Sequence, residues 1–289
     1  MKSYPKVSII IPTAIFPKII YSCLHSIAKL DYPQNNIEII IVNNAAPQTK
    51  ILNLTKKYPG VKIVHFAKNH GFAQAINTGA REARNAYLCI ANDDVLFEKH
   101  SLKLLITHLR NKPNIGTCGP TIISKNNQFA SCGYSMNFWT GSVRSLQKNE
   151  TPTPDWVQGC CLMIKKSLFL QLHGFDESFD HFFEDTDLCL RIKNIGLQIA
   201  CVANARIMHK DSTTANQNLS RKYYLWYKNK IRLMYKHFSP AQILTNSVFH
   251  FCLFIYYLVT NNPRSFALSK ASLWSFISLP KLIQTRYAS

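Results

Sequence analysis

Short apolar runs alternate with segments of helical periodicity over the first 111 residues. Parallel strands that are buried on both faces are near-continuous apolar runs, and four such runs occur, at Val7–Ile11, Ile37–Val42, Val61–Phe66 and Tyr87–Ile90. Between them, the apolar spacing predicts helices over 17–30, over 49–58 and from Asn69-His70-Gly71 to about Arg84. This alternation predicts a Rossmann-like half with a parallel sheet and helices on both faces.

The pattern is less regular after Asn111. Turn residues and several prolines predict mixed strands and a flexible loop around 124–155. Order returns in a strand-like run, Trp156–Ile164, and in helices over 167–173 and 184–195, each followed by a glycine. A short strand over 198–202 then precedes Arg206–His209.

The tail from Leu219 onward has a different character. Its first predicted helix places one set of residues on one face (Tyr224, Tyr227, Ile231, Met234, Phe238) and another away from it (Lys222, Asn229, Arg232, Lys236). Interleaved aromatic and basic residues suit a membrane surface. The segment 243–259 is the most apolar window, but polar residues interrupt it, so it is marginal as a spanning helix. We interpret it as an in-plane or shallowly inserted helix, with a buried core helix as the alternative.

Positive charge is concentrated in this tail. The 289-residue chain has a formal charge of +19, and residues 211–289 contain ten Lys/Arg against one acid. This indicates an anionic partner or surface. A nucleic-acid-binding protein is one alternative, but no nucleic-acid-binding motif is present and the basic residues lie in an aromatic, apolar segment.

The nine cysteines show no paired zinc-type spacing, and the only close pair is Cys160-Cys161. The first apolar run is too short for the core of a secretory leader. Reduced thiols in a cytoplasmic protein are therefore the expectation.

Two carboxylates follow the fourth predicted strand. The strand should stop at Asn92, because Asn and Asp are poor strand formers, and Asp93-Asp94 should lie in the loop beyond it. Ligands of open α/β sheets bind at this end of the strands, and carboxylates there suit a divalent cation and a phosphate-bearing substrate. The alternative is a solvated Asx turn.

A second acidic cluster is Glu184-Asp185-Thr186-Asp187. Asp187 and Arg191 are spaced as an i,i+4 salt pair. Asp185 lies behind Phe182-Phe183, where partial burial raises a carboxylate pKa, so it is a candidate general base. His209 follows a predicted strand and with Asp94 would complete a site for Mn²⁺ or Mg²⁺; alone, it could equally be an ordinary surface or core histidine.

Backbone amides at the start of the helix within Asn69–Gly79 provide a natural place for a phosphate or a nucleotide edge. The alternative is a simple helix cap with Gly79 as a packing position.

Taken in order, these segments resemble family 2 of the inverting nucleotide-sugar glycosyltransferases, in its rhamnosyltransferase-like branch, with the Rossmann-like GT-A fold. The matching pieces span about residues 7–210, and they are 7–13, 38–44, 69–79, Asn92-Asp93-Asp94, 159–166, 173–177, Glu184–Asp187 with Arg191, and His209.

The resemblance implies a role for each matching residue. Asp185 would be the base that deprotonates the acceptor hydroxyl, and Asp94 and His209 would bind a divalent cation, Mn²⁺ or Mg²⁺. The donor nucleotide sugar would lie along Pro12, Thr13, Asn43, Asn69, Gly71, Asn77, Asn92 and Asp93. The acceptor side would include Trp156, Gly159, Cys160 and Glu184.

One departure concerns Asn43, where family members usually carry an Asp that accepts a hydrogen bond from the nucleotide base. An Asn carbonyl accepts the same bond without charge assistance. A second departure is Ala46, where a small hydroxyl residue is common.

We therefore predict an α/β GT-A glycosyltransferase domain over 1–215, with a nucleotide-binding half, 1–111, and an acceptor-binding half, 112–215. A basic, membrane-associating helical tail should follow over 216–289. The predicted activity is metal-assisted transfer of a hexosyl or deoxyhexosyl group to a glycan or lipid-linked acceptor in surface polysaccharide synthesis. The protein would lie on the cytoplasmic face of the membrane, with residues 219–289 on its anionic surface and no nucleic-acid partner. The alternatives are an inactive homologue that binds nucleotide sugar, a nucleotidyltransferase and the nucleic-acid-binding protein.

Overall fold

The computed structural model describes residues 4–14, 19–124, 128–147, 153–179, 181–209, 219–262 and 264–287. The chain divides into two compact units, one formed by Met1–Tyr134, Ser145–Glu177 and Glu184–Asp211, the other by Ser135–Arg144, Ser178–Phe183 and Ser212–Ser289. The predicted boundary at 215/216, the predicted helix start at 17, and residues 125–127 and 148–152 of the predicted flexible loop lie outside the described residues.

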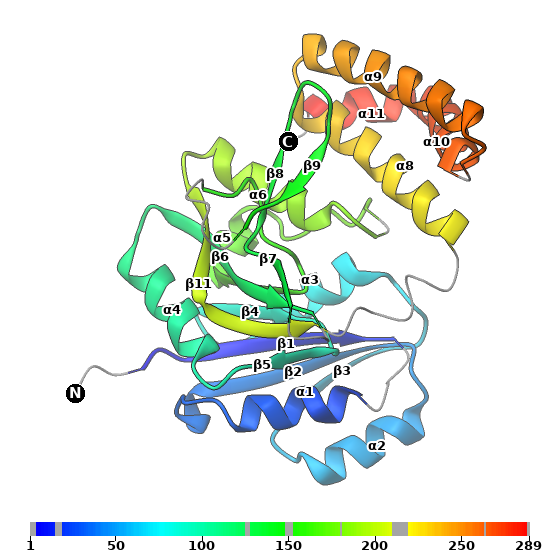
Figure 1. Ribbon diagram of the computed structural model, residues 1–289. Helices are drawn as coiled ribbons and strands as arrows, with labels where there is room; N and C mark the ends of the chain where they lie inside the picture. Colours follow the sequence, from blue (N-terminus) through cyan, green and yellow to red (C-terminus); the bar gives the residue numbers. More distant parts are fainter. Residues whose placement is uncertain are drawn as a thin grey trace. The chain divides into compact units, whose positions relative to one another are not determined.

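Strands and helices alternate through the first half of the chain (Figure 1). The described strands are β1 (Val7–Thr13), β2 (Ile37–Asn44), β3 (Lys62–Phe66), β4 (Tyr87–Ala91), β5 (Val95–Phe97), β6 (Ile115–Ile123), β7 (Phe129–Ser131), β8 (Tyr134–Met136), β9 (Val143–Ser145), β10 (Cys161–Lys165) and β11 (Gln198–His209). The described helices are α1 (Ile19–Ala28), α2 (Gln48–Lys57), α3 (Phe72–Glu82), α4 (Ser101–Asn111), α5 (Lys166–Gln171), α6 (Glu184–Asn194), α8 (Leu219–His237), α9 (Pro240–Val259), α10 (Arg264–Ile277) and α11 (Leu279–Tyr287).

The described part of the first unit contains a nine-stranded sheet in the order β3-β2-β1-β4-β10-β6-β11-β5, with β7 paired to β6. The four strands from β3 to β4 are parallel, which confirms the predicted Rossmann-like half. The expectation that β1 ends at Ile11 and β2 at Val42 is wrong. Both strands continue by two residues, because Pro12 pairs with Val42, Thr13 with Asn43, and Asn44 with Phe66 of β3.

The other half of the sheet is mixed. Strand β10 is antiparallel to β4 and β6, whereas β11 is parallel to β6 and antiparallel to β5. The sequence pattern did not predict β5, α4 or the long buried strand β6. The two segments predicted at 198–202 and 206–209 form one strand, β11, with an irregularity between Val202 and Arg206.

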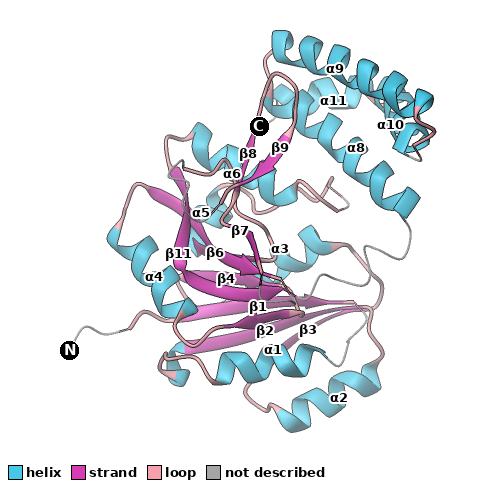
Figure 2. Cartoon of the chain, viewed as in Figure 1, coloured by secondary structure: helices cyan, strands magenta, loops and turns pink. Residues whose placement is uncertain are grey.

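Helices cover both faces of the sheet (Figure 2). Ile9 and Ile11 of β1 share a buried cluster with residues of α1, α2 and α4. Ile10 points the opposite way and meets α3, where a Cβ added at Gly79 would lie 2.5 Å from Ile10 Cγ2. Gly79 is therefore a packing position, as predicted for this residue in the alternative interpretation of its segment.

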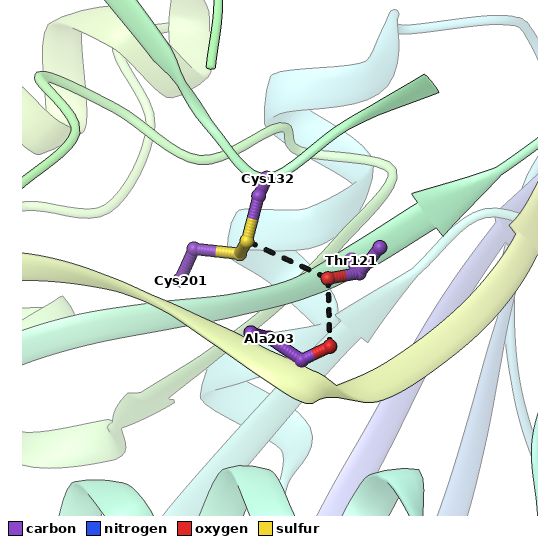
Figure 3. Close-up of a disulfide and its surroundings, with 4 residues drawn as sticks. All are labelled: Thr121, Cys132, Cys201 and Ala203. Atoms are coloured by element: carbon purple, nitrogen blue, oxygen red, sulfur yellow. Dashed lines mark hydrogen bonds between the residues drawn. A yellow bond between two sulfur atoms is a disulfide. The ribbon is translucent and has the colours of Figure 1, made fainter. Parts of the chain in front are cut away.

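Cys132, just after β7, forms a disulfide with Cys201 of β11, with 5.5 Å between their Cα atoms (Figure 3). Thr121 Oγ1 lies 3.5 Å from Cys132 Sγ and donates a hydrogen bond to the Ala203 carbonyl at 3.0 Å. The expectation that all nine thiols are reduced is wrong at this pair. The two cysteines are 69 residues apart, so their spacing gave no signal, and they meet only because β7 and β11 are both neighbours of β6.

Helices α8, α9 and α10 share a buried cluster of Tyr227, Tyr257, Ala267, Leu268 and Ala271, and α11 packs against α8 and α10. The prediction that Asn229 lies away from the buried face of α8 is wrong. Its side chain is fully buried and donates a hydrogen bond to the His181 carbonyl at 2.7 Å.

Helix α9 is long and apolar enough to cross a membrane, by length and composition alone, and only 11% of its most apolar stretch is buried. The alternative of a buried core helix is therefore wrong. Large apolar side chains such as Phe251, Tyr256 and Val259 remain exposed on it.

We predict that Gly79→Ala destabilises the first unit by roughly 1–3 kcal/mol, because its methyl group would overlap Ile10 and Val42 in a packed core. Gly60→Ala is the matched control, since a Cβ there meets nothing within 4 Å. Denaturant midpoints of the two variants provide the measurement. Equal midpoints would contradict this account of the interface between α3 and the sheet.

Candidate functional site

The carboxyl ends of β2, β1 and β4 lie next to one another in the sheet (Figure 1). Strand β4 ends at Ala91, and Asn92, Asp93 and Asp94 follow in a turn, as predicted. Thr13 Oγ1 donates a hydrogen bond to Asp93 Oδ2 at 2.6 Å. Burial raises the pKa of Asp93 to about 6, the bond from Thr13 opposes this, and the charge of Asp94 adds to it. Two carboxylates therefore lie at the edge where α/β sheets bind ligands.

Strand β5 brings His209 to this turn. The chain reverses after Asp94, with the Val95 N–H donating to the Asn92 carbonyl at 3.3 Å, and β5 then pairs antiparallel with the end of β11. His209 is in register with Val95, and its Nε2 lies 3.1 Å from Asp94 Oδ1. Asp94 and His209, which are 115 positions apart in the sequence, are thereby neighbours.

Asp94 is 6% exposed, and neither of its carboxylate oxygens accepts a hydrogen bond from the described residues. A buried carboxylate in this state favours a cationic ligand. The described residues contain no group of three or more His, Cys, Asp or Glu placed to hold a metal ion. Asp94 and His209 therefore fit a cation that takes its other ligands from substrate phosphates and water, as Mg²⁺ commonly does.

Asp185 lies in the first turn of α6 and is half-buried. Its Oδ2 accepts a hydrogen bond from the Gly159 amide at 2.8 Å, and its Oδ1 accepts one from the Thr186 amide at 2.7 Å. Burial raises the pKa of Asp185, while the bonds from Gly159 and Thr186 oppose the rise. The result is an oriented carboxylate with the environment of a general base.

The loop before β10 connects this carboxylate to the turn after β4. Gly159 binds Asp185, and the carbonyl of the next residue, Cys160, accepts a hydrogen bond from the Asn92 amide at 2.9 Å. Cys161 then pairs with Ala91. A Cβ at position 159 would lie 3.3 Å from Asp185 Cβ, so the glycine permits this close approach.

Glu184, next to Asp185, is 8% exposed, and its Oε2 has no hydrogen-bond partner among the described residues. Burial, and then the charge of Asp185, raise the pKa of Glu184. The predicted pair of Asp187 and Arg191 is confirmed, with Arg191 Nη2 2.7 Å from Asp187 Oδ2. Arg191 also donates to the Gly174 carbonyl at 2.8 Å, which makes the pair a structural one.

The side chains of the asparagines at the end of β2 form hydrogen bonds with other groups of the protein. Asn43 is fully buried, with its Oδ1 2.8 Å from the Ala46 amide and its Nδ2 2.7 Å from His65 Nδ1. Asn44, which sequence reasoning missed, donates to Asn69 Oδ1 at 2.9 Å. Asn69 Oδ1 also accepts from the Gly71 amide at 2.8 Å, just before α3. These bonds shape the loop that opens α3.

Asn77 of α3 is likewise buried. Its Nδ2 donates to the Phe175 carbonyl at 2.8 Å and to Glu177 Oε1 at 3.0 Å, and its Oδ1 accepts from the Phe175 amide at 2.8 Å. Both amide hydrogens are thus used to join α3 to the turn after α5. Gly174, with φ of +71°, makes that turn possible.

On the predicted acceptor side, Trp156 is only 5% exposed and stacks on Tyr134 with ring centroids 5.3 Å apart. Gln158 Nε2 donates to the Tyr134 hydroxyl at 2.7 Å. Tyr134, which was not predicted, and Gln158, which lies within the predicted acceptor-side stretch 156–160, support the loop that presents the Gly159 amide. Cys160 is buried.

Comparison with known families gives two matches. The model described as "Glycosyl transferase family 2" matches residues 8–171, more than half of the chain. The model described as "N-terminal domain of galactosyltransferase" matches residues 143–213.

Several curated proteins are similar in sequence. The O-antigen biosynthesis protein RfbC of Myxococcus xanthus is 25% identical over 231 residues, which cover 74% of this chain and 18% of that protein. The N-acetylglucosaminyl-diphospho-decaprenol L-rhamnosyltransferase of Mycobacterium tuberculosis is 25% identical over 60% of this chain and 66% of its own length. Rhamnosyltransferase WbbL of Escherichia coli is 21% identical over 73% of this chain and 88% of its own length. The chain thus spans less than two thirds of the first two relatives.

Solved structures share the fold. GalNAc-T7 with UDP, GalNAc and Mn²⁺ superposes with a TM-score of 0.69 at 16% identity, over 84% of this chain and 50% of that one. Mannosyltransferase PcManGT from Pyrobaculum calidifontis, in complex with GDP-Man and Mn²⁺, superposes with a TM-score of 0.60 at 17% identity, over 96% and 76%. These likenesses confirm the predicted α/β GT-A fold.

We predict that Glu184→Gln becomes more stabilising as the pH rises. Because the folded-state pKa of Glu184 is raised, the wild-type fold retains the proton at low pH and loses stability as the pH rises from the ordinary glutamate pKa through the raised one. The stability difference between variant and wild type should grow across this window by on the order of 1–3 kcal/mol.

Urea denaturation at several pH values measures this difference. The control is Glu98→Gln, which removes one carboxylate at an exposed position. A flat difference for Glu184→Gln would show that the glutamate is not held in a desolvated position.

Proposed function

The chain belongs to glycosyl transferase family 2, and from this premise we propose that it is an inverting glycosyltransferase that moves a sugar from a nucleotide-sugar donor to a hydroxyl group. The observation that carries the proposal is the arrangement around the Gly159–Cys160 loop. One residue of that loop binds the Asp185 carboxylate, and the next binds the backbone of the turn that contains Asp93 and Asp94.

Asp185 is the proposed general base. In an inverting transfer the acceptor oxygen attacks the anomeric carbon opposite the departing nucleoside diphosphate, so one C–O bond forms as the other breaks. The acceptor proton passes to the Asp185 carboxylate. Hydrogen bonds from Gly159 and Thr186 orient that carboxylate, and partial burial increases its basicity.

Asp94 and His209 are the proposed cation ligands. A bound Mn²⁺ or Mg²⁺ would supply the positive charge that stabilises the departing diphosphate. The side chains support this by their separation of 3.1 Å and by the buried Asp94 oxygens that accept no hydrogen bond from the described residues. Thr13 fixes the neighbouring Asp93, which keeps a second carboxylate in the same turn.

The donor is proposed to lie along Pro12, Thr13, Asn92, Asp93 and the loop from Asn69 to Gly71. Asn43 and Asn77 are proposed to act by shaping that region, because their amides bind protein atoms. The names of the rhamnosyltransferase and O-antigen relatives support a deoxyhexosyl or hexosyl donor, a glycan or lipid-linked acceptor and a role in surface polysaccharide synthesis.

We place the transferase domain at residues 1–215 and a membrane-associating tail at 216–289, on the cytoplasmic face. The exposed apolar residues of α9 and the basic composition of the tail support association with an anionic surface.

An inactive homologue that binds nucleotide sugar is the second candidate, favoured by the replacement of the usual Asp by an internally bonded Asn43. A thermal-shift screen of nucleotide sugars with Mn²⁺ or Mg²⁺, followed by an assay for release of the nucleoside diphosphate to an acceptor, distinguishes the two. Binding without release would favour the inactive homologue.

We predict that Asp185→Asn lowers turnover by about 10²–10⁴-fold, the usual cost of losing a general base, while the donor still raises the melting temperature. In the wild type, turnover should fall as the pH drops through the raised pKa of Asp185, and the residual activity of the variant should lack this fall. The exposed Glu98→Gln variant is the control. Turnover at the wild-type level in Asp185→Asn would remove Asp185 from this role.

We also predict that EDTA abolishes both turnover and donor-induced thermal stabilisation. Donor at about 100 times its Kd should stabilise the cation-loaded wild type by about 2.7 kcal/mol. Asp94→Asn and His209→Gln should weaken this cation-dependent part, whereas the control His100→Gln, at an exposed position, should retain it. Full activity and unchanged donor binding in EDTA would contradict the assignment of Asp94 and His209.

A further inference from the structure

Two consecutive residues just before α6 have backbone conformations that are unusual for residues with a side chain. Phe182 and Phe183 have φ angles of +71° and +70°, in the left-handed region. A Cβ makes this region costly, and glycine is the residue that adopts it readily. Such strain persists only where the surrounding structure enforces it, and it is concentrated at functional sites. Here the strained pair directly precedes Glu184 and Asp185, with which α6 begins.

Helix α8 supplies contacts that enforce this backbone. The Asn229 side chain is fully buried, and its Nδ2 donates to the His181 carbonyl at 2.7 Å and to the Phe182 carbonyl at 3.4 Å. Trp226, three residues earlier on α8, packs on the buried Phe183 ring, with 5.5 Å between the ring centroids. One side of α8 therefore holds all three residues before α6, two by their carbonyls and one by its ring.

The part that Asn229 plays in this packing lies in its amide hydrogens. Its Oδ1 is buried and has no hydrogen-bond partner among the described residues, so the carbonyls of His181 and Phe182 alone set the orientation of the amide. A buried acceptor without a partner lowers the stability of the fold. What this side chain contributes is therefore the fixed position of two carbonyls in the strained segment.

The direction of the Asp185 carboxylate depends on where α6 begins. Phe183 is joined to Glu184 by a peptide bond, and Asp185 is the second residue of α6. The Asp185 carboxylate accepts the hydrogen bond from the Gly159 amide at 2.8 Å, and such a bond weakens steeply when its geometry changes. If the backbone at Phe182 and Phe183 relaxed to negative φ angles, the chain would enter α6 in another direction and this bond would be lost.

We propose that Asn229 is a positioning residue for the Asp185 carboxylate: by fixing the carbonyls of His181 and Phe182, it maintains the left-handed backbone from which α6 starts. The inference rests on the proposed function only where it takes Asp185 as the base, because the positioning itself is a property of the fold. Turnover then depends on a side chain of the C-terminal helices.

The test compares Asn229→Ala with Asn246→Ala in the full chain. Asn246 is a matched control, because it is also fully buried and its Nδ2 donates to two carbonyls, those of Phe138 and Gln242, at 2.8 Å each. Its Oδ1 likewise has no hydrogen-bond partner among the described residues. Both variants remove the same kind of group from equally buried positions, so a general loss of stability is common to both.

The first readout is hydrogen exchange of the Gly159 amide, whose acceptor is Asp185 Oδ2. This exchange should be at least about tenfold faster in Asn229→Ala than in Asn246→Ala, because a displaced Asp185 no longer protects the amide. Equal rates would overturn the proposal, whatever reaction the protein catalyses. If Asn229→Ala does not fold, the same comparison is made between Asn229→Ser and Asn246→Ser, which are milder changes.

A Phe182→Gly background tests whether Asn229 acts through the strained backbone. Glycine adopts positive φ angles about as readily as negative ones, so the loop no longer needs to be held in place. In this background Asn229→Ala should change the exchange rate of the Gly159 amide by less than about threefold. The full tenfold effect in the glycine background would contradict the proposed route from Asn229 to Asp185.

The second readout is the split between kcat and KM. Asn229→Ala should lower kcat by about 10–100-fold, the cost of a misplaced catalytic group, and leave KM for the donor within about threefold of wild type. Asn246→Ala should keep kcat within about threefold. In an Asp185→Asn background Asn229→Ala should cause no further loss, because no base remains to be positioned.

The outcomes separate this inference from the proposed function. Turnover at the wild-type level in Asp185→Asn would count against the proposed function and leave the result on Gly159 exchange standing. Loss of turnover in Asp185→Asn, with equal kcat in Asn229→Ala and Asn246→Ala, would count against Asn229 alone.

Discussion

Two backbone hydrogen bonds made by consecutive residues bring the candidate chemistry together. The Gly159 amide binds the Asp185 carboxylate at 2.8 Å, and the Cys160 carbonyl accepts from the Asn92 amide at 2.9 Å. The amino end of α6 and the turn after β4 are thereby fixed to one loop. Glycine at 159 eases this approach, because a Cβ there would lie 3.3 Å from Asp185 Cβ, a tight contact that would require Asp185 to shift by a few tenths of an ångström. Buried polar bonds of this kind specify a single arrangement, because breaking either one leaves an unsatisfied group.

The sequence predicted the parallel half of the fold because each buried strand there is a continuous apolar run bounded by turn residues. It did not predict β5, a three-residue strand too short for any periodicity, or the length of β6, whose Gly116, Gly119 and Pro120 resemble turn residues. The Cys132–Cys201 bond could not be predicted from the sequence either, because the order of the strands in the sheet, and not the spacing along the chain, brings the two cysteines together.

At the site, the position of Asp94 after β4 followed from the residues alone, whereas its pairing with His209 was one of two open interpretations of that histidine, which the family resemblance then favoured. The structure supplies the missing physical cause, which is the reversal through β5 that places His209 in register with Val95. Asn44 and Tyr134 were missed because supporting hydrogen bonds leave no periodic signal. The position of Asn229 was predicted wrongly because a pattern of helical spacing assigns polar side chains to the solvent-facing side. The Asn229 amide is instead buried and hydrogen-bonded to the His181 carbonyl.

The central claim is that Asp94, His209 and Asp185 serve one reaction site. A crystal structure of the full chain with Mn²⁺ and the nucleotide sugar that most raises its melting temperature tests this most directly. The account predicts the cation in contact with Asp94 and His209 Nε2, and the Asp185 carboxylate facing the anomeric carbon from the side opposite the diphosphate. A donor or cation bound away from the turn after β4, or an Asp185 carboxylate turned away from the sugar, would contradict it.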